Sequence, residues 1–239
     1  MLTPVPPGYS ERTALIKDLL PWQVPLATYS PNPALEKDLD LFPSMDELSD
    51  LQQNRNRLSY EGHINFDNSD RSLNPIVRTG LYAKGHLWNW GPNQAADALI
   101  IYRDSDSQQV YFLAIQRKNG SWAIPGGFKD KGENSTLAAL RELQEEALII
   151  NSHLQSDFIN KTTCIYAGYA DDPRNTDNAW IETSVHFLPV TADYAKALIL
   201  RAAADAQAVK WQPASAAVLK DLYSNHAYFV KAATKLLTA

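Results

Sequence analysis

Three glutamates lie close together near the end of a segment that otherwise has the pattern of an ordinary amphipathic helix. Like charges four residues apart, such as Glu142 and Glu146, repel at a cost of about 0.2–0.5 kcal/mol, and Glu145 and Glu146 lie where the helix dipole favours cations. Ala138 and Ala139 lie on the same side and are expected to leave room for a ligand. The opposite side carries the apolar residues Leu137, Leu140, Leu143, Ala147 and Leu148. Grouped carboxylates are ligands that Mg²⁺ and Mn²⁺ prefer, so the pattern indicates a cation site, and the alternative is a solvated acidic face.

The residues before this helix favour a site. Pro125, Gly126 and Gly127 predict a sharp turn that leaves main-chain groups open to a ligand. Long helical side chains lean toward the N-terminus of their helix, so Arg141 is aimed back at this loop. We expect Arg141 to form an ion pair with Glu133, which fastens the loop to the helix.

The spacing of these residues matches a known signature. In order, the matching residues are Gly127, then Glu133, then Arg141-Glu142-Leu143, then Glu145-Glu146. They resemble the signature of the Nudix hydrolases, Gly-x5-Glu-x7-Arg-Glu-U-x-Glu-Glu-x-Gly-U, in which U is a bulky aliphatic residue. Every charged position matches, whereas the glycine after the acidic pair is Leu148 here, so the usual glycine helix cap is missing.

This resemblance implies a chemistry, because Nudix enzymes hydrolyse a nucleoside diphosphate linked to another group. It assigns Mg²⁺, or else Mn²⁺, to the ligands Glu142, Glu145, Glu146 and Gly127. It makes Glu133 and Arg141 the supporting catalytic pair. Divalent cations neutralise the anionic oxygens that repel a nucleophile, and they lower the pKa of a bound water. The general base is left open between a glutamate of the signature and a carboxylate on a later loop.

A second polar stretch, "DDPRNTDNAW", lies between two predicted strands. Asp171-Asp172-Pro173 signals a turn, and the turn displays Arg174. An arginine fork suits a phosphate, and an aspartate suits sugar hydroxyls. The alternative is a hairpin whose Asp and Asn side chains bond their own backbone, and the residues alone leave both interpretations open.

This stretch resembles the ADP-ribose pyrophosphatases of the mitochondrial type and the ADP-ribose-binding domain of melastatin-type cation channels. The resemblance runs from about Pro21 to the C-terminus, through "PWQVPLATYSP", "NPIVRTGLYAKGHLWNWGPNQAADALI", "WAIPGGFKDKGE", "EEAL", "VKWQ" and "LYSNHAYF". That group has Ala-Leu where other Nudix proteins have x-Gly, so Leu148 marks a branch. The substrate contacts that it implies are Asp172, Arg174, Tyr223, Asn225 and His226.

Two of these residues have simpler explanations. Tyr223 is either an aromatic platform for a base or a core residue, and His226 is either a ligand or a helix cap. Trp122 and Trp180 are expected in the core.

The implied function is hydrolysis of ADP-ribose to AMP and ribose 5-phosphate by attack of metal-activated water on the diphosphate. One alternative is a Nudix hydrolase of another nucleoside diphosphate derivative, such as a nucleotide sugar or a dinucleoside polyphosphate. The other is a sensor module that binds ADP-ribose with little hydrolysis. The retained Arg141, Glu142, Glu145 and Glu146 favour catalysis.

Composition narrows the remaining classes. The net charge is −5 without a basic run, which argues against a nucleic-acid partner. The single cysteine, Cys164, excludes an intrachain disulfide. The sequence has no apolar run of transmembrane or signal-peptide length, so we expect a cytoplasmic protein without a membrane partner. The sequence does not indicate the oligomeric state.

The predicted fold class is α+β, with a mixed β-sheet between helices, preceded by a smaller loop-rich N-terminal lobe. We place the lobe, which we expect to contribute to substrate binding, at residues 1–95 and the Nudix domain at residues 96–239. In the lobe, prolines are dense, and Trp22, Tyr29, Leu41 and Phe42 supply apolar surface to bury. The predicted strands of the domain are "DALIIYRD", "VYFLAIQRK", "SWAIPGG", "TTCIYAGYA", "NAWIETSVHFLPV" and "QAVKWQPA". The predicted helices are residues 135–148, part of "TADYAKALILRAAADA", and residues 215–222 and 225–237.

Overall fold

A computed structural model describes residues 5–35, 48–53 and 57–237. The chain divides into two compact units, one of Met1–Asn93 with Gly168–Glu182 and one of Gln94–Ala167 with Thr183–Ala239. The first unit ends at Asn93, close to the predicted boundary at residues 95/96, and the segment 168–182 belongs with the N-terminal residues in this division. Leu41 and Phe42 lie outside the described residues.

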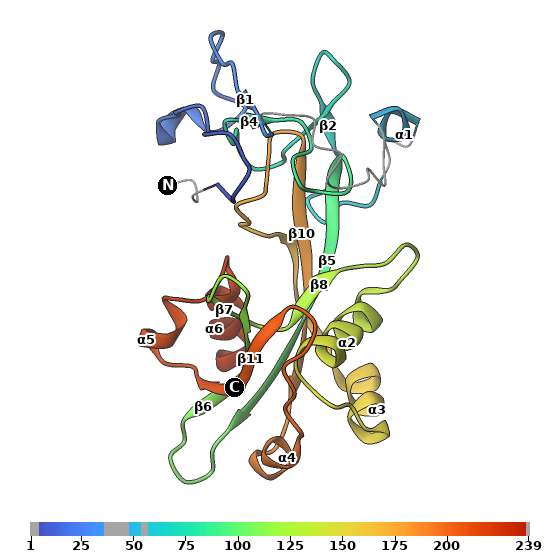
Figure 1. The fold of residues 1–239 in the computed structure, drawn as a ribbon, viewed down its shortest axis with the longest axis vertical. Helices are drawn as coiled ribbons and strands as arrows, with labels where there is room; N and C mark the ends of the chain where they lie inside the picture. The colour runs from blue at the N-terminus through green and yellow to red at the C-terminus, as the bar shows by residue number, and fades with distance from the viewer. Residues whose placement is uncertain (1–4, 36–47, 54–56, 238–239) are drawn as a thin grey trace. The chain divides into compact units, whose positions relative to one another are not determined.

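A seven-stranded sheet supplies the framework of the second unit (Figure 1). Its strands are β5 (Gly91–Arg103), β6 (Val110–Arg117), β7 (Trp122–Ala123), β8 (Gly126–Phe128), β9 (Thr163–Tyr169), β10 (Ala179–Pro189) and β11 (Ala206–Pro213). The order is β11-β6-β5-β10-β9, with β7 added to β6 and β8 added to β5. The pairs β5–β6, β6–β11, β6–β7 and β5–β8 are antiparallel. β5, β9 and β10 each continue into residues of the other unit.

The helices of this unit begin at polar capping residues. They are α2 (Ser135–Glu146), α3 (Ser152–Lys161), α4 (Ala192–Ala197), α5 (Ala216–Leu219) and α6 (His226–Leu236). Asn134 and Asn151 each accept a hydrogen bond from a backbone N–H three residues on, which satisfies a donor in the first turn of α2 and of α3. Among the described helices, none has the length and apolar character needed to cross a bilayer.

The core of the second unit has two layers, one on each side of the sheet. Along β5, Ala96, Ala98 and Ile100 pack with residues of α2 and α3, whereas Leu99 and Ile101 pack with residues of α5 and α6. Successive side chains of a strand point to opposite faces, so a strand covered on both faces is apolar without interruption. Figure 1 shows α2 and α3 on one side of the sheet and α5 and α6 on the other. The predicted class, a sheet between helices, is confirmed.

The structure corrects details of the acidic helix. The helix ends at Glu146 rather than at residue 148. Leu137, predicted on the apolar side, is 43% exposed. Ala138 and Ala139, which we expected to leave room for a ligand, are fully buried in the core. The small side chains therefore bring α2 close to the sheet and leave no space there.

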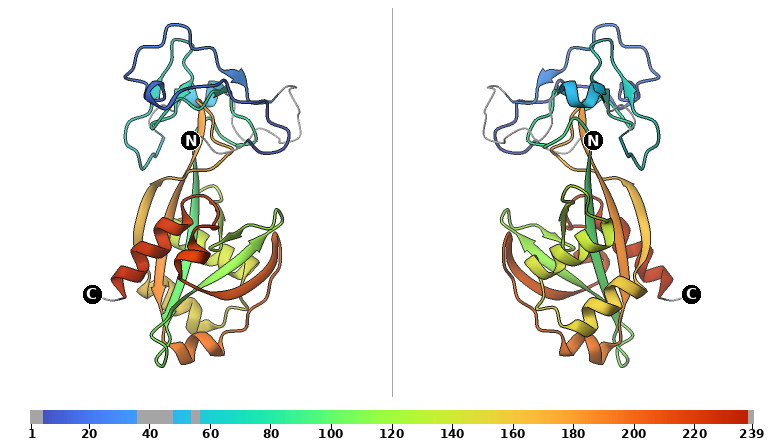
Figure 2. Two further views of the ribbon diagram at one scale, coloured as in Figure 1. Left: turned by 90° about the vertical axis from the view of Figure 1, so that its left-hand side faces the viewer. Right: turned by 90° about the vertical axis from the view of Figure 1, so that its right-hand side faces the viewer.

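The first unit is built from short strands and long connections, as Figures 1 and 2 show. β1 (Asn32–Pro33) pairs parallel with β4 (Leu81–Tyr82), and β2 (Asn65–Phe66) pairs antiparallel with β3 (Ser72–Leu73). A 3-10 helix, η1 (Lys17–Leu19), and one helix, α1 (Leu48–Gln53), complete its regular elements among the described residues. So little regular structure leaves many backbone groups to be satisfied by side chains.

Arg78 satisfies several of these groups. Its guanidinium donates to the carbonyl oxygens of Leu19, Pro21, Trp22 and Val24 at distances from 2.6 to 3.4 Å. The same group lies 4.8 Å from the ring centroid of Trp22 and 5.4 Å from that of Tyr29. The Arg78 guanidinium thus holds together a turn whose carbonyl groups are not paired in a helix or a sheet.

We predict that Arg78→Lys destabilises the protein by about 2–4 kcal/mol, because an ammonium reproduces neither the fork of donors nor the stacking. The matched control is Arg71→Lys, since Arg71 is a partly exposed arginine of the same unit that pairs with Asp67. That change should cost less than about 1 kcal/mol. Urea denaturation followed by tryptophan fluorescence measures both effects. Equal shifts of the two variants would contradict this role of Arg78.

Candidate active site

Two glycines allow carboxylates to lie directly against the backbone of β8. A Cβ atom at Gly127 would lie 2.5 Å from Oε1 of Glu142, and a Cβ atom at Gly126 would collide with the Asp97 carboxylate. The N–H of Gly126 donates to Oε2 of Glu146 at 3.0 Å. Glycine is therefore required at both positions, because the carboxylates come so close to the backbone. We call the space above Gly126 and Gly127 the Gly-Gly cradle, and any side chain there would fill it.

Arg141 connects the loop before α2 to the acidic side of the helix. Its Nε and Nη2 donate to the two carboxylate oxygens of Glu133 at 3.1 and 3.0 Å, which confirms the predicted pair. Nη2 also donates to the carbonyl oxygen of Phe128 at 2.9 Å. Nη1 donates to Glu142 at 2.7 Å and to Glu145 at 3.3 Å. The hydrogen bond from Arg141 lowers the pKa of Glu133, so this carboxylate is held ionised.

The carboxylates nearest the Gly-Gly pair are desolvated. Burial raises the pKa of Glu146 to about 7, against the lowering effect of the Gly126 N–H, and Glu142 and Asp97 raise it further. Burial also raises the pKa of Asp97 to about 7, although Thr183 donates a hydrogen bond to it at 2.6 Å. The pKa of Glu142 is raised by burial as well. The pKa values of Asp97, Glu142 and Glu146 are all raised, so a positive charge must lie near these three carboxyl groups if they are to be ionised together.

The donor set fits a divalent cation. In the described part of the chain, no three His, Cys, Asp or Glu side chains already stand in a metal-binding arrangement. However, Glu142 and Glu146 offer hard oxygen ligands beside the Gly126-Gly127 cradle, and Arg141 already provides positive charge to Glu142 and Glu145. Glu142, Glu145, Glu146 and Gly127 remain the predicted ligands.

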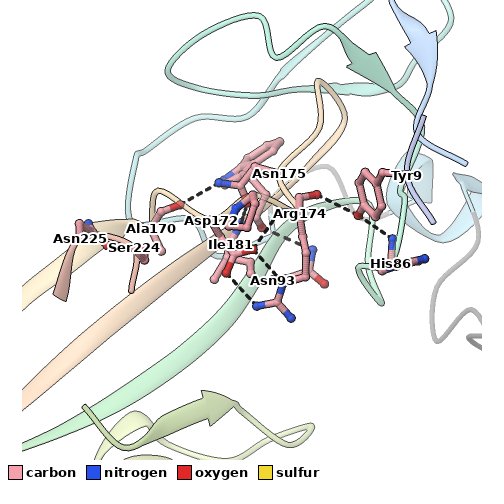
Figure 3. A network of polar contacts seen from close by, with 12 residues as sticks. Tyr9, His86, Asn93, Ala170, Asp172, Arg174, Asn175, Ile181, Ser224 and Asn225 are labelled. Atoms are coloured by element: carbon pink, nitrogen blue, oxygen red, sulfur yellow. Dashed lines mark hydrogen bonds and ion pairs between the residues drawn. The ribbon is translucent and has the colours of Figure 1, made fainter. Parts of the chain in front are cut away.

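The loop of the first unit closes on itself. Asp172 and Arg174 form a two-point ion pair, in which Nε and Nη2 of Arg174 donate to Oδ1 and Oδ2 of Asp172 at 2.8 and 2.9 Å (Figure 3). The Asp172 side chain is only 5% exposed. The arginine fork that we expected to be displayed for a phosphate is therefore engaged with its neighbour.

Other residues of this loop are buried and bond to backbone, as the alternative interpretation expected. Nδ2 of Asn175 donates to the Ala170 carbonyl at 2.8 Å, and the hydroxyl of Tyr9 donates to the Arg174 carbonyl at 3.0 Å (Figure 3). Arg12 donates to the Pro173 and Asn175 carbonyls. These hydrogen bonds fasten the loop that carries Asp172 and Arg174.

The segment at the start of α6 attaches to β7. The Tyr223 N–H donates to the Trp122 carbonyl at 2.8 Å, and Nδ1 of His226 accepts the Ile124 N–H at 3.0 Å. Asn225, rather than His226, is the N-cap of α6, and its Oδ1 accepts a hydrogen bond from Ser224 (Figure 3). His226 is therefore not a helix cap. Trp180 is fully buried as predicted, whereas Trp122 is partly buried.

Sequence reasoning missed three residues of the second unit. Asp97 and Thr183 form a buried pair against Gly126, and Arg117 lies at the end of β6 over the Tyr223 ring. A charged residue at the start of the apolar run "ALIIY" was a signal for Asp97. Thr183 and Arg117 had no local signal, because their partners are distant in sequence.

The second unit is an α+β fold in which a helix that carries glutamates packs against a strand with two adjacent glycines. This combination is what the Nudix signature predicts. The chain belongs to the Nudix family, since the family model described as NUDIX domain matches residues 92–233. The Nudix resemblance seen in the signature is thus confirmed. Nudix hydrolases generally use divalent metal ions.

The similarity to known proteins covers more of the chain than the family model does. Nudix hydrolase 6 of Caenorhabditis elegans is 43% identical over 179 residues, which cover 73% of this chain and 68% of that protein. The mitochondrial ADP-ribose pyrophosphatase of Rattus norvegicus is 40% identical over 200 residues, which cover 73% of this chain and 56% of that protein. A transient receptor potential cation channel, subfamily M member-like 2, of Nematostella vectensis is 34% identical; the match covers 99% of this chain and 17% of the channel.

The raised pKa of Glu146 predicts a pH-dependent stability in metal-free buffer. The folded protein binds this proton more tightly than the unfolded chain, whose value is near 4.5, so stability is lost as pH rises from 4.5 through about 7. Glu146→Gln cannot ionise and should gain on the order of 2–3 kcal/mol relative to wild type between pH 5 and pH 8. Urea denaturation with a chelator at both pH values measures this. A difference between the two proteins that stays constant with pH would contradict the assignment.

Proposed function

We propose that this protein hydrolyses ADP-ribose to AMP and ribose 5-phosphate. The observation that carries the proposal is the 40% identity to the rat mitochondrial ADP-ribose pyrophosphatase, combined with an intact set of signature carboxylates around the Gly-Gly cradle. The Nudix family membership supports the proposed reaction class, and the identity to this relative supports ADP-ribose as the proposed substrate.

The chain's own residues have distinct parts in this proposal. Glu142, Glu145, Glu146 and Gly127 would hold Mg²⁺, for which Mn²⁺ is the alternative. This cation would supply positive charge to the diphosphate oxygens and acidify the attacking water. Glu133 fixes Arg141, and Arg141 fixes the loop of Phe128 and the carboxylates of Glu142 and Glu145.

The substrate contacts proposed from the resemblance are the residues Asp172, Arg174, Tyr223, Asn225 and His226. The ion pair with Asp172 fixes the Arg174 guanidinium, so Arg174 meets a substrate from a preformed position. Asp172, which already accepts both bonds from Arg174, orients this arginine. The proposed location is the cytoplasm.

A second candidate is an ADP-ribose-binding module with little hydrolysis. The match to the Nematostella channel, which covers 99% of this chain, favours it. The retained Arg141 and Glu142, with their hydrogen bond of 2.7 Å, favour catalysis instead. A third candidate, hydrolysis of another nucleoside diphosphate derivative, differs from the leading proposal only in substrate.

Product analysis tests the proposal directly. Incubation of the purified chain with ADP-ribose and Mg²⁺ should give AMP and ribose 5-phosphate in equal amounts. A panel with nucleotide sugars and dinucleoside polyphosphates should show slower turnover. Faster hydrolysis of another diphosphate would replace ADP-ribose as the substrate, and tight ADP-ribose binding without products would identify a sensor.

The double variant Glu145→Gln with Glu146→Gln separates binding from chemistry. It removes two negative charges from the proposed cation site, so turnover should fall by at least about 1,000-fold while ADP-ribose binding stays measurable by calorimetry. The matched control is Asp193→Asn with Asp205→Asn, which removes two exposed charges from the same unit. This control should keep its activity. Full activity of the first variant would refute the ligand assignment.

A further inference from the structure

Asp97 is a buried carboxylate that has no place in the Nudix signature. It lies on β5, directly opposite Gly126 of β8 in the antiparallel pair. A Cβ atom at Gly126 would collide with Oδ1 of Asp97, so this oxygen occupies the space that a side chain on β8 would fill. The register of the two strands and the missing side chain of the glycine together fix where Oδ1 lies.

The other oxygen of this carboxylate is held by Thr183 of β10. The Thr183 hydroxyl donates to Oδ2 of Asp97 at 2.6 Å. In the part of the chain that the structure describes, no other group donates a hydrogen bond to this carboxylate, and no basic side chain forms an ion pair with it. Asp97 is only 7% exposed, and buried charges in proteins are paired or coordinate metals. Oδ1 therefore lacks the partner that its burial requires.

Two glutamates of α2 meet the same pair of glycines. Glu146 accepts the Gly126 N–H at 3.0 Å, and the Glu142 carboxylate lies where a Cβ atom of Gly127 would be. Asp97 reaches Gly126 from the neighbouring strand, whereas the glutamates reach the Gly-Gly cradle from the helix. Three carboxylates from two elements thus converge on two adjacent residues, and a cation bound at the cradle would lie near all three.

The geometry favours a contact through water over a direct bond between Asp97 and such a cation. Among the described residues, no three acidic side chains already stand close enough together to bind one ion directly. Mg²⁺ usually keeps several of its waters when a protein binds it. A water on the ion is a donor, and Oδ1 of Asp97 is a charged acceptor that no described residue satisfies. Donor and acceptor therefore match at this oxygen.

We propose that Oδ1 of Asp97 binds a water molecule of the divalent cation and that Thr183 orients the carboxylate for this contact. The inference rests on the proposed function for the presence of the cation, and it adds a positioning residue outside the signature. It also gives a reason for glycine at position 126, since a side chain there would displace Oδ1. The competing explanation is that Asp97 only joins β5 to β10 through its hydrogen bond with Thr183.

Titration of the full chain with Mn²⁺, followed by electron paramagnetic resonance, separates these explanations without substrate. Asp97→Asn keeps an acceptor for the Thr183 hydroxyl but turns an amide, which donates, toward Gly126. Its Mn²⁺ affinity should fall by about 10- to 100-fold, the range for groups that contact the ligands of a metal. Thr183→Val leaves the carboxylate in place and should lose less affinity. The matched control is Asp157→Asn, which removes a carboxylate of the same unit that pairs with Lys161 and should leave the affinity unchanged.

Asp97→Glu keeps the charge but moves the oxygens by one methylene, so it should retain only part of the wild-type affinity. Melting curves confirm that each variant is folded, and this glutamate variant carries the test if Asp97→Asn does not fold. The inference is overturned if wild type binds no Mn²⁺, if Asp97→Asn or Asp97→Glu binds it as wild type does, or if Thr183→Val loses as much affinity as Asp97→Asn. Failure of the proposed function looks different, because wild type would then bind Mn²⁺ but release no AMP from ADP-ribose.

Discussion

The packing of carboxylates against the backbone of Gly126 and Gly127 is the constraint on which the second unit depends. Glu142 lies where a Cβ of Gly127 would be, and Glu146 accepts the Gly126 N–H. Such packing excludes water, so burial raises the pKa of both acids and positive charge becomes necessary if they are to be ionised together. Arg141 supplies part of this charge to Glu142 and Glu145. A divalent cation would supply the rest, and this need explains why a helix tolerates three glutamates in its last turns.

Local geometry made part of this site predictable. Residues four apart on a helix lie on one face, and long side chains lean toward the N-terminus, so the pair of Arg141 with Glu133 followed from spacing alone. The fold class was also readable, because the predicted strands alternate with predicted helices, and the stretch "ALIIY" of β5 is apolar on both faces. Leu148 needs no left-handed conformation, since its N–H and that of Ala147 both bond the Leu143 carbonyl as the helix ends. The chain can therefore do without the glycine of the signature at this position.

The remaining features depend on contacts between distant segments, which no local pattern encodes. Ala138 and Ala139 looked like open space, yet α2 uses them to approach the sheet. Asp97 with Thr183, and Arg117 with Tyr223, are partners separated by most of the domain in sequence. Likewise, the segment 168–182 belongs with the N-terminal residues because Arg12, Tyr9 and Asn74 bond its backbone. The sequence alone suggested which ligands the polar residues could bind, but not which residues of the protein they already contact.

The most direct test of the account is the binding of Mn²⁺, followed by electron paramagnetic resonance, in the presence of an ADP-ribose analogue with a methylene bridge in place of the diphosphate oxygen. The account predicts that Mn²⁺ and the analogue strengthen each other's binding in wild type, and that Glu142→Gln with Glu146→Gln abolishes the bound signal. If the doubly substituted protein bound Mn²⁺ as tightly as wild type, the buried carboxylates would not be the cation site, and the central claim would fail.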